Sequence, residues 1–462
     1  MAHAFYPIPM IWLGFALLAV ACLMAFVGGR AAALGLPASG STRKVQANQF
    51  GYFAAIGAGA PILLLLTLFG VFGDTLTRAA LVNALPDGFE AMSASDLNLY
   101  FDQVTLAANA DPTGDILFDA VVRQYQWICG SAKIWLVIGG LVAGACGFLY
   151  ARSRLSESFR AREAVERAFE WVLFISAVIA IATTAGILMS LVFESFRFFG
   201  DTNIFGFLFG LEWNAQTNQD FGALPLFFGT FFIAIIAMAV AAPIGLYAAI
   251  YLSEYASASM RGRVKPLLEI LAGVPTVVYG FFAIQIVAPL VKSGADAVNS
   301  AAGVELLAAS PTNALAAGLV MGIMIIPFVS SLSDDVINAV PQNLRDGALA
   351  MGATKSETIK QVVMPAALPG VIASLMLAVS RAIGETMIVT MAAGLRSQIT
   401  LDPTSEITTI TVQIVALLTG DSEFDSAKTL SAFALGLVLF IVTLCLNLFA
   451  LRAVRRYREI YD

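Results

Sequence analysis

The sequence predicts an all-α, polytopic membrane protein with about nine transmembrane helices. Hydrophobic residues make up 59% of the 462 residues and charged residues only 13%, a balance that is too apolar for a soluble domain. Nine stretches hold about 20 mainly apolar residues, enough for a helix to cross a hydrocarbon core of about 30 Å. Lys and Arg also gather in alternate connecting segments, as they do in cytoplasmic loops.

The apolar stretches that define the predicted spans follow one another along the whole chain. They are residues 10–27, 50–72, 134–150, 171–192, 226–251, 271–291, 314–332, 371–395 and 430–451. No Lys or Arg precedes the first stretch, so we interpret it as a retained membrane anchor rather than a cleavable signal peptide. A further apolar patch, residues 410–418, is too short to cross and is predicted to be re-entrant or interfacial on the outer side.

The basic residues set the orientation of the predicted spans. With the N-terminus outside and the C-terminus inside, the cytoplasmic segments hold eighteen of the 26 Lys and Arg residues. The outer segments hold seven, and Arg381 lies within a span. The cytoplasmic set is Arg30, Arg43, Lys44, Arg152, Arg154, Arg160, Arg162, Arg167, Arg261, Arg263, Lys265, Arg345, Lys355, Lys360, Arg452, Arg455, Arg456 and Arg458.

Two regions are predicted along the chain. Residues 1–170 hold three spans, an acidic outer loop at about 73–133 and a charged cytoplasmic helix at 152–170, and residues 171–462 hold the other six spans. Within the outer loop, apolar residues at helical spacing between Ile116 and Ile128 predict a small folded cap. An acidic cap repels anions, so this loop is interpreted as a spacer or as a docking surface.

The residue types needed for catalysis or metal binding are scarce. His3 is the only histidine, and of four cysteines only Cys129 lies in a predicted polar loop. The sequence contains no phosphate-binding loop of the Gly-x-x-x-x-Gly-Lys-Ser/Thr type. This composition argues against redox, metal and acid-base chemistry, so uphill transport would draw its energy from a partner or a gradient.

One cytoplasmic loop, residues 341–365, has more local structure than a simple connection needs. Pro341 favours the start of a short helix, and Gly352 favours a left-handed turn at its end. Thr354 and Glu357 then have the spacing of a capping box, which predicts a second short helix ending at Pro365 and Pro369. A bent helix pair at the membrane surface suggests a docking site, although a chance amphipathic loop is the alternative.

The same loop resembles the EAA loop of ABC importer permeases, which is Glu-Ala-Ala, three residues, Gly, nine residues and Ile-x-Leu-Pro. The resemblance implies a coupling helix that docks on an ATP-hydrolysing subunit. Asp for Glu and Gly for Ala are the departures in its first turn. The matching positions are Asp346, Gly347, Ala348, Gly352, Val362, Met364 and Pro365, and Thr354, Lys355 and Glu357 between them are further candidate coupling residues.

The eighth predicted span carries ionisable residues near its middle. Arg381 and Glu385 are four residues apart, which predicts one helix face, and Ser380 and Thr386 flank them. Charges at that depth are costly and normally face a bundle interior or an aqueous path. The guanidinium fork of arginine suits tetrahedral oxyanions, so we interpret the four residues as part of an anion path. A pair that merely neutralises itself is the alternative.

This span, Ser-Arg-Ala-Ile-Gly-Glu-Thr-Met, and Gly-Val-Pro-Thr-Val-Val-Tyr-Gly at residues 273–280 resemble the permeases of the phosphate-specific ABC importers, the Pst family. The Met-Ile-Val after Thr386 is closer to the PstC type than to the PstA type. The resemblance covers about residues 171–462 and implies a six-helix type I importer (MetI-like) core in a bacterial inner membrane. Pro275 and Tyr279 fit either a functional role or a helix break that shapes packing.

The resemblance also implies partners. They are a PstA-like permease, two copies of a PstB-like ATP-binding subunit and a periplasmic PstS-like phosphate-binding protein; ATP is used by the partner, and no cofactor is expected on this chain. A phosphate permease is therefore expected, in which Glu385 holds Arg381 until phosphate arrives. Three alternatives stay open: a permease for molybdate or sulfate, a self-contained secondary transporter that uses the same ion pair as its relay, and a membrane-embedded enzyme, for which few acid-base groups exist.

Overall fold

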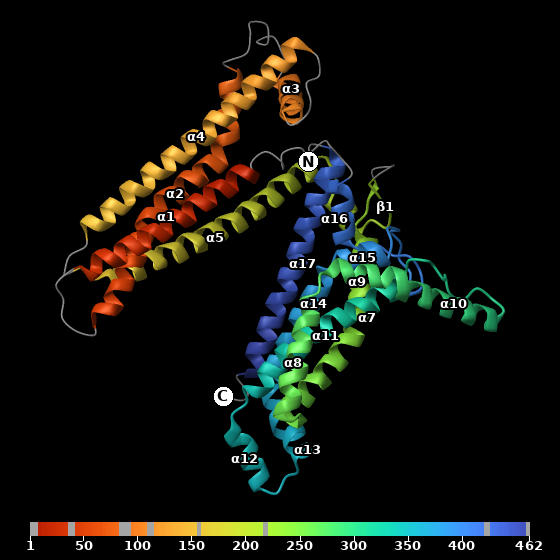
Figure 1. Ribbon diagram of the computed structural model, residues 1–462. Coiled ribbons are helices and arrows are strands. Elements are labelled where there is room, and N and C mark those ends of the chain that lie inside the picture. The colour runs from red at the N-terminus through yellow and green to blue at the C-terminus, as the bar shows by residue number, and fades with distance from the viewer. Residues whose placement is uncertain are drawn as a thin grey trace. The chain divides into compact units, whose positions relative to one another are not determined.

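The computed structural model describes residues 8–35, 42–82, 94–108, 115–154, 159–215, 220–419 and 426–458. Within these residues nine helices are long and apolar enough to cross a membrane, as the sequence predicted. The chain divides into two compact units, Met1–Ala182 and Thr183–Asp462, and the boundary falls inside the long helix α5 (Ala161–Asp201). Helices dominate both units (Figure 1).

The first unit is built on three neighbouring helices, α1 (Ile8–Leu34), α2 (Thr42–Val82) and α4 (Ile116–Ser153), which lie side by side in Figure 1. Glycines let α2 and α4 approach closely. A Cβ atom at Gly147 would lie only 2.0 Å from the carbonyl oxygen of Gly57. Small residues at such a crossing are typical of helix packing in membranes, where close van der Waals contact replaces the hydrophobic driving force.

The predicted outer loop 73–133 is largely helical. Helix α2 continues to Val82, α4 begins at Ile116, and α3 (Ala94–Ala107) lies between them, while residues 83–93 and 109–114 lie outside the described residues. The expectation that Cys129 lies in a polar loop is wrong, because this residue is part of α4 and its side chain is buried. It belongs to an apolar cluster of α2, α3 and α4 formed by Leu81, Phe101, Val104, Ala108, Val121, Val122, Tyr125 and Cys129.

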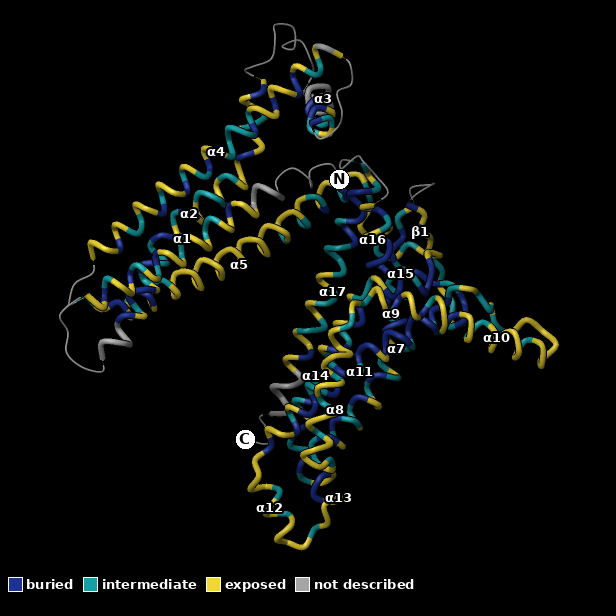
Figure 2. Tube along the Cα trace, viewed as in Figure 1, coloured by how far each residue is buried: buried dark blue, intermediate teal, exposed yellow. Residues whose placement is uncertain are grey.

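The charged segment 152–170 is not a separate helix. Helix α4 ends at Ser153, and residues from Ala161 onward are the first turns of α5. Ion pairs at helical spacing support these first turns: Arg160 lies 2.8 Å from Glu163, and Arg162 lies 2.7 Å from Glu166. Within the described residues, most of the apolar stretch that follows in α5 is exposed (Figure 2).

The second unit is a helix bundle that begins with small outer elements. Asn203 caps the short helix α6 (Ile204–Phe209), and the strands β1 (Trp213–Asn214) and β2 (Asp220–Phe221) pair antiparallel. The remaining elements are α7 (Leu224–Ile250), α8 (Ala258–Ala272), α9 (Thr276–Phe282), α10 (Ala288–Ala302), α11 (Ala314–Asn338), α12 (Gln342–Ala350), α13 (Lys355–Thr358), α14 (Met364–Ile383), α15 (Met387–Ala392), α16 (Ile410–Thr419) and α17 (Ala427–Arg458).

Helices α7 and α11 form the centre of this bundle, and α14 and α15 pack against them (Figure 1). The α7–α11 contact is close because one side is glycine: a Cβ atom at Gly322 would lie 2.8 Å from the carbonyl oxygen of Ala237. Helix α16 has 10 residues, which is too short to span, as the sequence predicted.

In the part of the chain that the structure describes, three π-helical turns interrupt the spans, at Tyr251–Tyr255, Ala283–Val287 and Ile359–Val363. The third corrects the expectation that Pro365 and Pro369 end a helix. Helix α13 runs through this turn into α14, where Pro365 occupies the first turn and Pro369 lies inside the helix. Proline has no N–H to donate, so it fits the first turn of a helix without a lost hydrogen bond.

Candidate functional site

The break between α14 and α15 lies at the predicted anion path. Helix α14 ends at Ile383, Gly384 follows as its cap, and α15 begins at Met387. Arg381 is in the last turn of α14 and is exposed within this chain. Its guanidinium carbon lies 5.4 Å from the centre of the Phe328 ring.

The position of Phe328 gives the depth of this contact. Phe328 lies near the middle of α11, which spans the bundle from Ala314 to Asn338. Arg381 therefore lies near mid-depth, although it is near the end of its own helix. Among the described residues, Arg381 forms no ion pair. A guanidinium over an aromatic face is attracted by the ring quadrupole and keeps its donors available.

Glu385 does not share a helix face with Arg381, so that prediction is wrong. The reason is the break at Gly384, beyond which the Glu385 carboxylate turns to the start of α15. Oε1 accepts hydrogen bonds from the backbone N–H groups of Met387, at 3.1 Å, and Ile388, at 3.4 Å. The first N–H groups of a helix lack backbone partners, and a carboxylate satisfies them well.

Threonine hydroxyls satisfy much of the unwound backbone at this break. Thr411 in α16 donates to the carbonyl oxygen of Glu385 at 2.9 Å, and Thr386 donates to that of Gly384 at 3.4 Å. Ser380 is half-buried in the last turn of α14, one residue before Arg381. The four predicted path residues thus flank one break, and Thr411 is an additional contact that sequence spacing could not reveal.

The segment 273–280 forms a second break, between α8 and α9. Pro275 precedes the first residue of α9, and the hydroxyl of Tyr279 donates to the carbonyl oxygen of Leu271 at 2.9 Å. This contact satisfies a carbonyl near the end of α8. Gly280 brings α9 against α15, since a Cβ atom there would lie 3.2 Å from the carbonyl oxygen of Met387. The helix break expected at Pro275 and Tyr279 is therefore present, and Tyr279 bonds across it.

The loop 341–365 has the predicted bent form. Helix α12 ends before Gly352, which has a φ of +89°. This backbone conformation favours glycine, because residues with a side chain rarely adopt it. The capping box is confirmed: the Glu357 N–H donates to the Thr354 hydroxyl, and the Glu357 carboxylate accepts from the Thr354 N–H at 2.8 Å. Pro341 lies one residue before α12 rather than inside it.

The outward-facing residues of this loop are available to a partner. Helix α12 contains no buried residue, and Asp346, Gly347, Lys355 and Glu357 are exposed, whereas Ala348 is half-buried. Lys355 lies with its ammonium 5.2 Å from the centre of the Tyr255 ring. A hairpin whose surface is exposed in this way can dock without unfolding.

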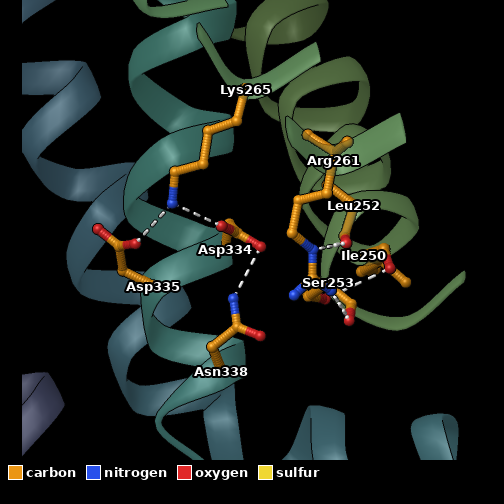
Figure 3. Close-up of polar contacts among 8 residues, drawn as sticks. All are labelled: Ile250, Leu252, Ser253, Arg261, Lys265, Asp334, Asp335 and Asn338. Carbon is orange, nitrogen blue, oxygen red and sulfur yellow. Dashed lines mark hydrogen bonds and ion pairs between the residues drawn. The ribbon is translucent and has the colours of Figure 1, made fainter. Parts of the chain in front are cut away.

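A polar layer joins α8 to α11 on the same side of the unit (Figure 3). Lys265 lies 2.9 Å from Asp334 and 3.2 Å from Asp335, and Asn338 donates to Asp334 at 2.9 Å. The hydrogen bond to Asp334, together with the nearby Asp335, raises the pKa of Lys265 above its usual value. The sequence predicts Lys265 only as a cytoplasmic charge, because its partners lie about 70 positions away along the chain.

Within the described residues, no group of three or more His, Cys, Asp or Glu side chains is placed to hold a metal ion. The chemistry available at the mid-depth break is binding, through a cationic fork and hydroxyl groups, rather than bond making. The fold and this site define a transport subunit: a bundle of membrane helices with a cationic break at mid-depth and an exposed helical hairpin.

The comparisons with known proteins agree with this class. Residues 241–459 match the family of binding-protein-dependent transport system inner membrane components, and residues 15–183 match the family described as phosphate ATP-binding cassette transporter. The second match covers the region to which no function could be assigned from sequence.

Curated relatives extend the similarity. A PstC phosphate transport system permease of Mesorhizobium japonicum is 32% identical over 294 residues, covering 61% of this chain and 86% of the relative. The Haemophilus influenzae PstC is 33% identical over 293 residues, 60% of this chain and 90% of the relative. The protein named "Probable ABC transporter permease protein YqgH" of Bacillus subtilis is 31% identical over 293 residues, 63% of this chain and 91% of the relative.

The protein is thus a multi-pass inner-membrane permease subunit of an ABC importer, which works with ATP-hydrolysing and substrate-binding components and carries no ATPase of its own. Within that class, the chain belongs to the PstC-type permease family.

Proposed function

We propose that this chain moves inorganic phosphate across the bacterial inner membrane as one permease of an ATP-driven importer. The proposal rests on the position of Arg381. This residue lies at mid-depth beside a helix break, and its guanidinium faces the Phe328 ring instead of a carboxylate. The names of its PstC relatives and the phosphate transporter family matched at residues 15–183 support phosphate as the substrate.

Arg381 is proposed to be the first cationic contact of phosphate inside the membrane. The guanidinium offers two parallel N–H donors that fit two oxygens of a tetrahedral oxyanion. Ser380 and Thr386 lie beside it along the chain and supply hydroxyl groups near the break. Glu385 is proposed to act through α15, by holding the first turn of that helix, rather than by holding Arg381.

The hairpin formed by α12 and α13 is proposed to be the coupling element. Its residues Asp346, Gly347, Ala348, Gly352, Thr354, Lys355, Glu357 and Pro365 would dock on and follow the ATP-binding subunit. Closure of two such subunits would pull the hairpin and switch the path from inward to outward access. The remaining partners are proposed to be a PstA-like permease, two PstB-like subunits and a PstS-like binding protein, with ATP used by the partner and no cofactor on this chain.

The test is uptake of labelled phosphate in cells or vesicles that carry the whole importer. Arg381→Gln is expected to lower uptake at least about tenfold, and Arg381→Lys to retain part of it, because lysine keeps the charge without the fork. Arg396→Gln is the matched control, since Arg396 is also basic and exposed but lies outside the predicted spans. Normal uptake in Arg381→Gln would contradict the proposed path.

Two further measurements separate the other candidates. Unlabelled molybdate and sulfate should compete weakly, and strong competition by either would reassign the cargo to that oxyanion. Vesicles without ATP should show no phosphate accumulation. Accumulation without ATP would favour a self-contained secondary transporter.

A further inference from the structure

Helix α12 is not anchored by apolar packing. None of its residues is buried, and only Arg345 and Ala348 are half-buried. A short helix with an exposed apolar surface has little to fix its direction. Polar contacts of Arg345 connect it to two other elements of the bundle.

Arg345 has two partners on two different elements. Its Nη1 forms an ion pair with the carboxylate of Glu254, and the two side chains are only 12% and 10% exposed. Its Nη2 donates to the carbonyl oxygen of Ile337, in the last turns of α11, at 2.6 Å. Charged hydrogen bonds shielded from water are strong and directional, so Arg345 fixes α12 to both elements.

Glu254 belongs to the π-helical turn Tyr251–Tyr255 at the end of α7. This turn is itself held in place, because Arg261 of α8 donates to the carbonyl oxygen of Leu252 at 2.7 Å and also to that of Ser253 (Figure 3). The carbonyl groups at the end of a helix otherwise lack partners. The turn therefore offers Glu254 from a fixed position.

The second helix of the hairpin reaches the same turn. Lys355 begins α13, and its ammonium lies 5.2 Å from the centre of the ring of Tyr255, the residue after Glu254. Two successive residues of one π-helical turn thus hold the two arms of the hairpin. The end of α7 is the place where both arms join the core of the bundle.

We propose that Glu254 and Arg345 are positioning residues that carry displacement of the hairpin to α7. Helix α7 packs along α11 in the central core and so reaches the depth of Phe328, the residue that faces Arg381. A pull on α12 then moves α7 and α11 with it. This inference rests on the coupling role proposed above for α12 and adds the residues through which the bundle follows it.

The test uses the assembled importer with Glu254→Gln and Arg345→Gln. Three quantities are measured: co-purification of the ATP-binding subunit, ATP hydrolysis, and phosphate taken up per ATP hydrolysed. We expect co-purification and hydrolysis to persist, while uptake per ATP falls about fivefold or more, a typical size for coupling between sites. Arg263→Gln is the control, because Arg263 is exposed on α8 and, among the described residues, bonds only Ser259 of its own helix.

A double variant with the two charges exchanged tests whether the single variants lose uptake only because they fold poorly. Glu254→Arg combined with Arg345→Glu restores the pair but not the donor to Ile337, so partial recovery of uptake per ATP is expected. Unchanged uptake per ATP in both single variants would overturn the proposal. Loss of co-purification in step with uptake would also overturn it, because the pair would then serve docking alone.

Failure of the proposed function would look different. If wild-type importer did not accumulate phosphate, the substrate assignment would fail, and the ratio would be measured with the oxyanion that it does accumulate. The effect of Glu254→Gln on the amount of that oxyanion taken up per ATP would still decide whether Glu254 and Arg345 carry displacement of the hairpin to α7.

Discussion

The ammonium group of Lys265 lies 2.9 Å from the carboxylate of Asp334, a residue 69 positions further along the chain whose side chain is only 3% exposed. Asn338 completes the contact by donating to the same carboxylate. A buried carboxylate is stable only when it is paired and hydrogen-bonded. The pair therefore ties α8 to α11.

Replacing Lys265 with Met should destabilise the protein more than replacing both partners. Lys265→Met leaves the Asp334 carboxylate without its cation, at a cost of roughly 1–3 kcal/mol, between values for surface and buried pairs. Lys265→Met with Asp334→Asn removes both charges and should cost less. Thermal unfolding of the purified proteins measures this, and a double variant as unstable as the sum of the single ones would contradict the pairing.

The same pair predicts a pH dependence. Because the folded-state pKa of Lys265 is raised above the usual 10.5, its contribution is fully present below that value and is lost as pH rises through the folded pKa. The stability difference between wild type and Lys265→Met should therefore stay constant from about pH 6 to about pH 9. A difference that already shrinks in that interval would argue against the ion pair.

Gly352→Pro should separate the two helices of the hairpin. Proline fixes φ near −65°, whereas Gly352 has a φ of +89°. The expected result is loss of the ATP-binding subunit on co-purification with normal membrane insertion. Gly262→Ala is the control: this exposed glycine of α8 lies outside the hairpin and has no atom within 4 Å of a Cβ, so alanine should stabilise α8 by about 0.5–1 kcal/mol and preserve the complex.

Thr354→Ala should loosen the start of α13. It removes the hydroxyl group that accepts from the Glu357 N–H, and such caps contribute about 1 kcal/mol. Faster hydrogen exchange of the α13 amides is the expected observation. Ser356→Ala, an exposed change within the same helix, should leave exchange nearly unchanged, and equal effects of the two variants would speak against the capping box.

Gly280→Ala should disturb the contact between α9 and α15. The new Cβ atom would lie 2.8 Å from the sulfur of Met391 and 3.2 Å from the carbonyl oxygen of Met387. Overpacking of this kind costs about 1–3 kcal/mol. Met391→Ala in the same chain should recover much of the loss in unfolding experiments, because the flexible thioether is the nearer obstacle. No recovery would place the strain at the backbone instead.

Local features of the fold could be predicted from sequence. The spans follow from apolar length, and the capping box and the turn at Gly352 follow from residue types at short spacing. Each depends on neighbours along the chain. The ends of α13 and α14 could not be predicted from residue types, because a π-helical turn lets the chain stay helical through Pro365.

Contacts between distant residues could not be predicted in this way. Glu254 and Arg345 are 91 positions apart, and no periodicity relates them. The candidate site shows the same limit. The spacing of Arg381 and Glu385 predicts one helix face, but Gly384 ends the helix between them and their side chains meet different partners.

The exposed surface of the hairpin has a consequence for how the protein is made. Leu344 and Leu349 are 48% exposed and Met351 is 89% exposed, on a segment that the distribution of Lys and Arg predicts to face the cytosol. Apolar side chains left uncovered in water tend to adhere to other proteins and to attract chaperones and proteases. Copies of this chain in excess over the ATP-binding subunit would thus be prone to aggregation and degradation. Synthesis of the two proteins in matched amounts avoids this loss.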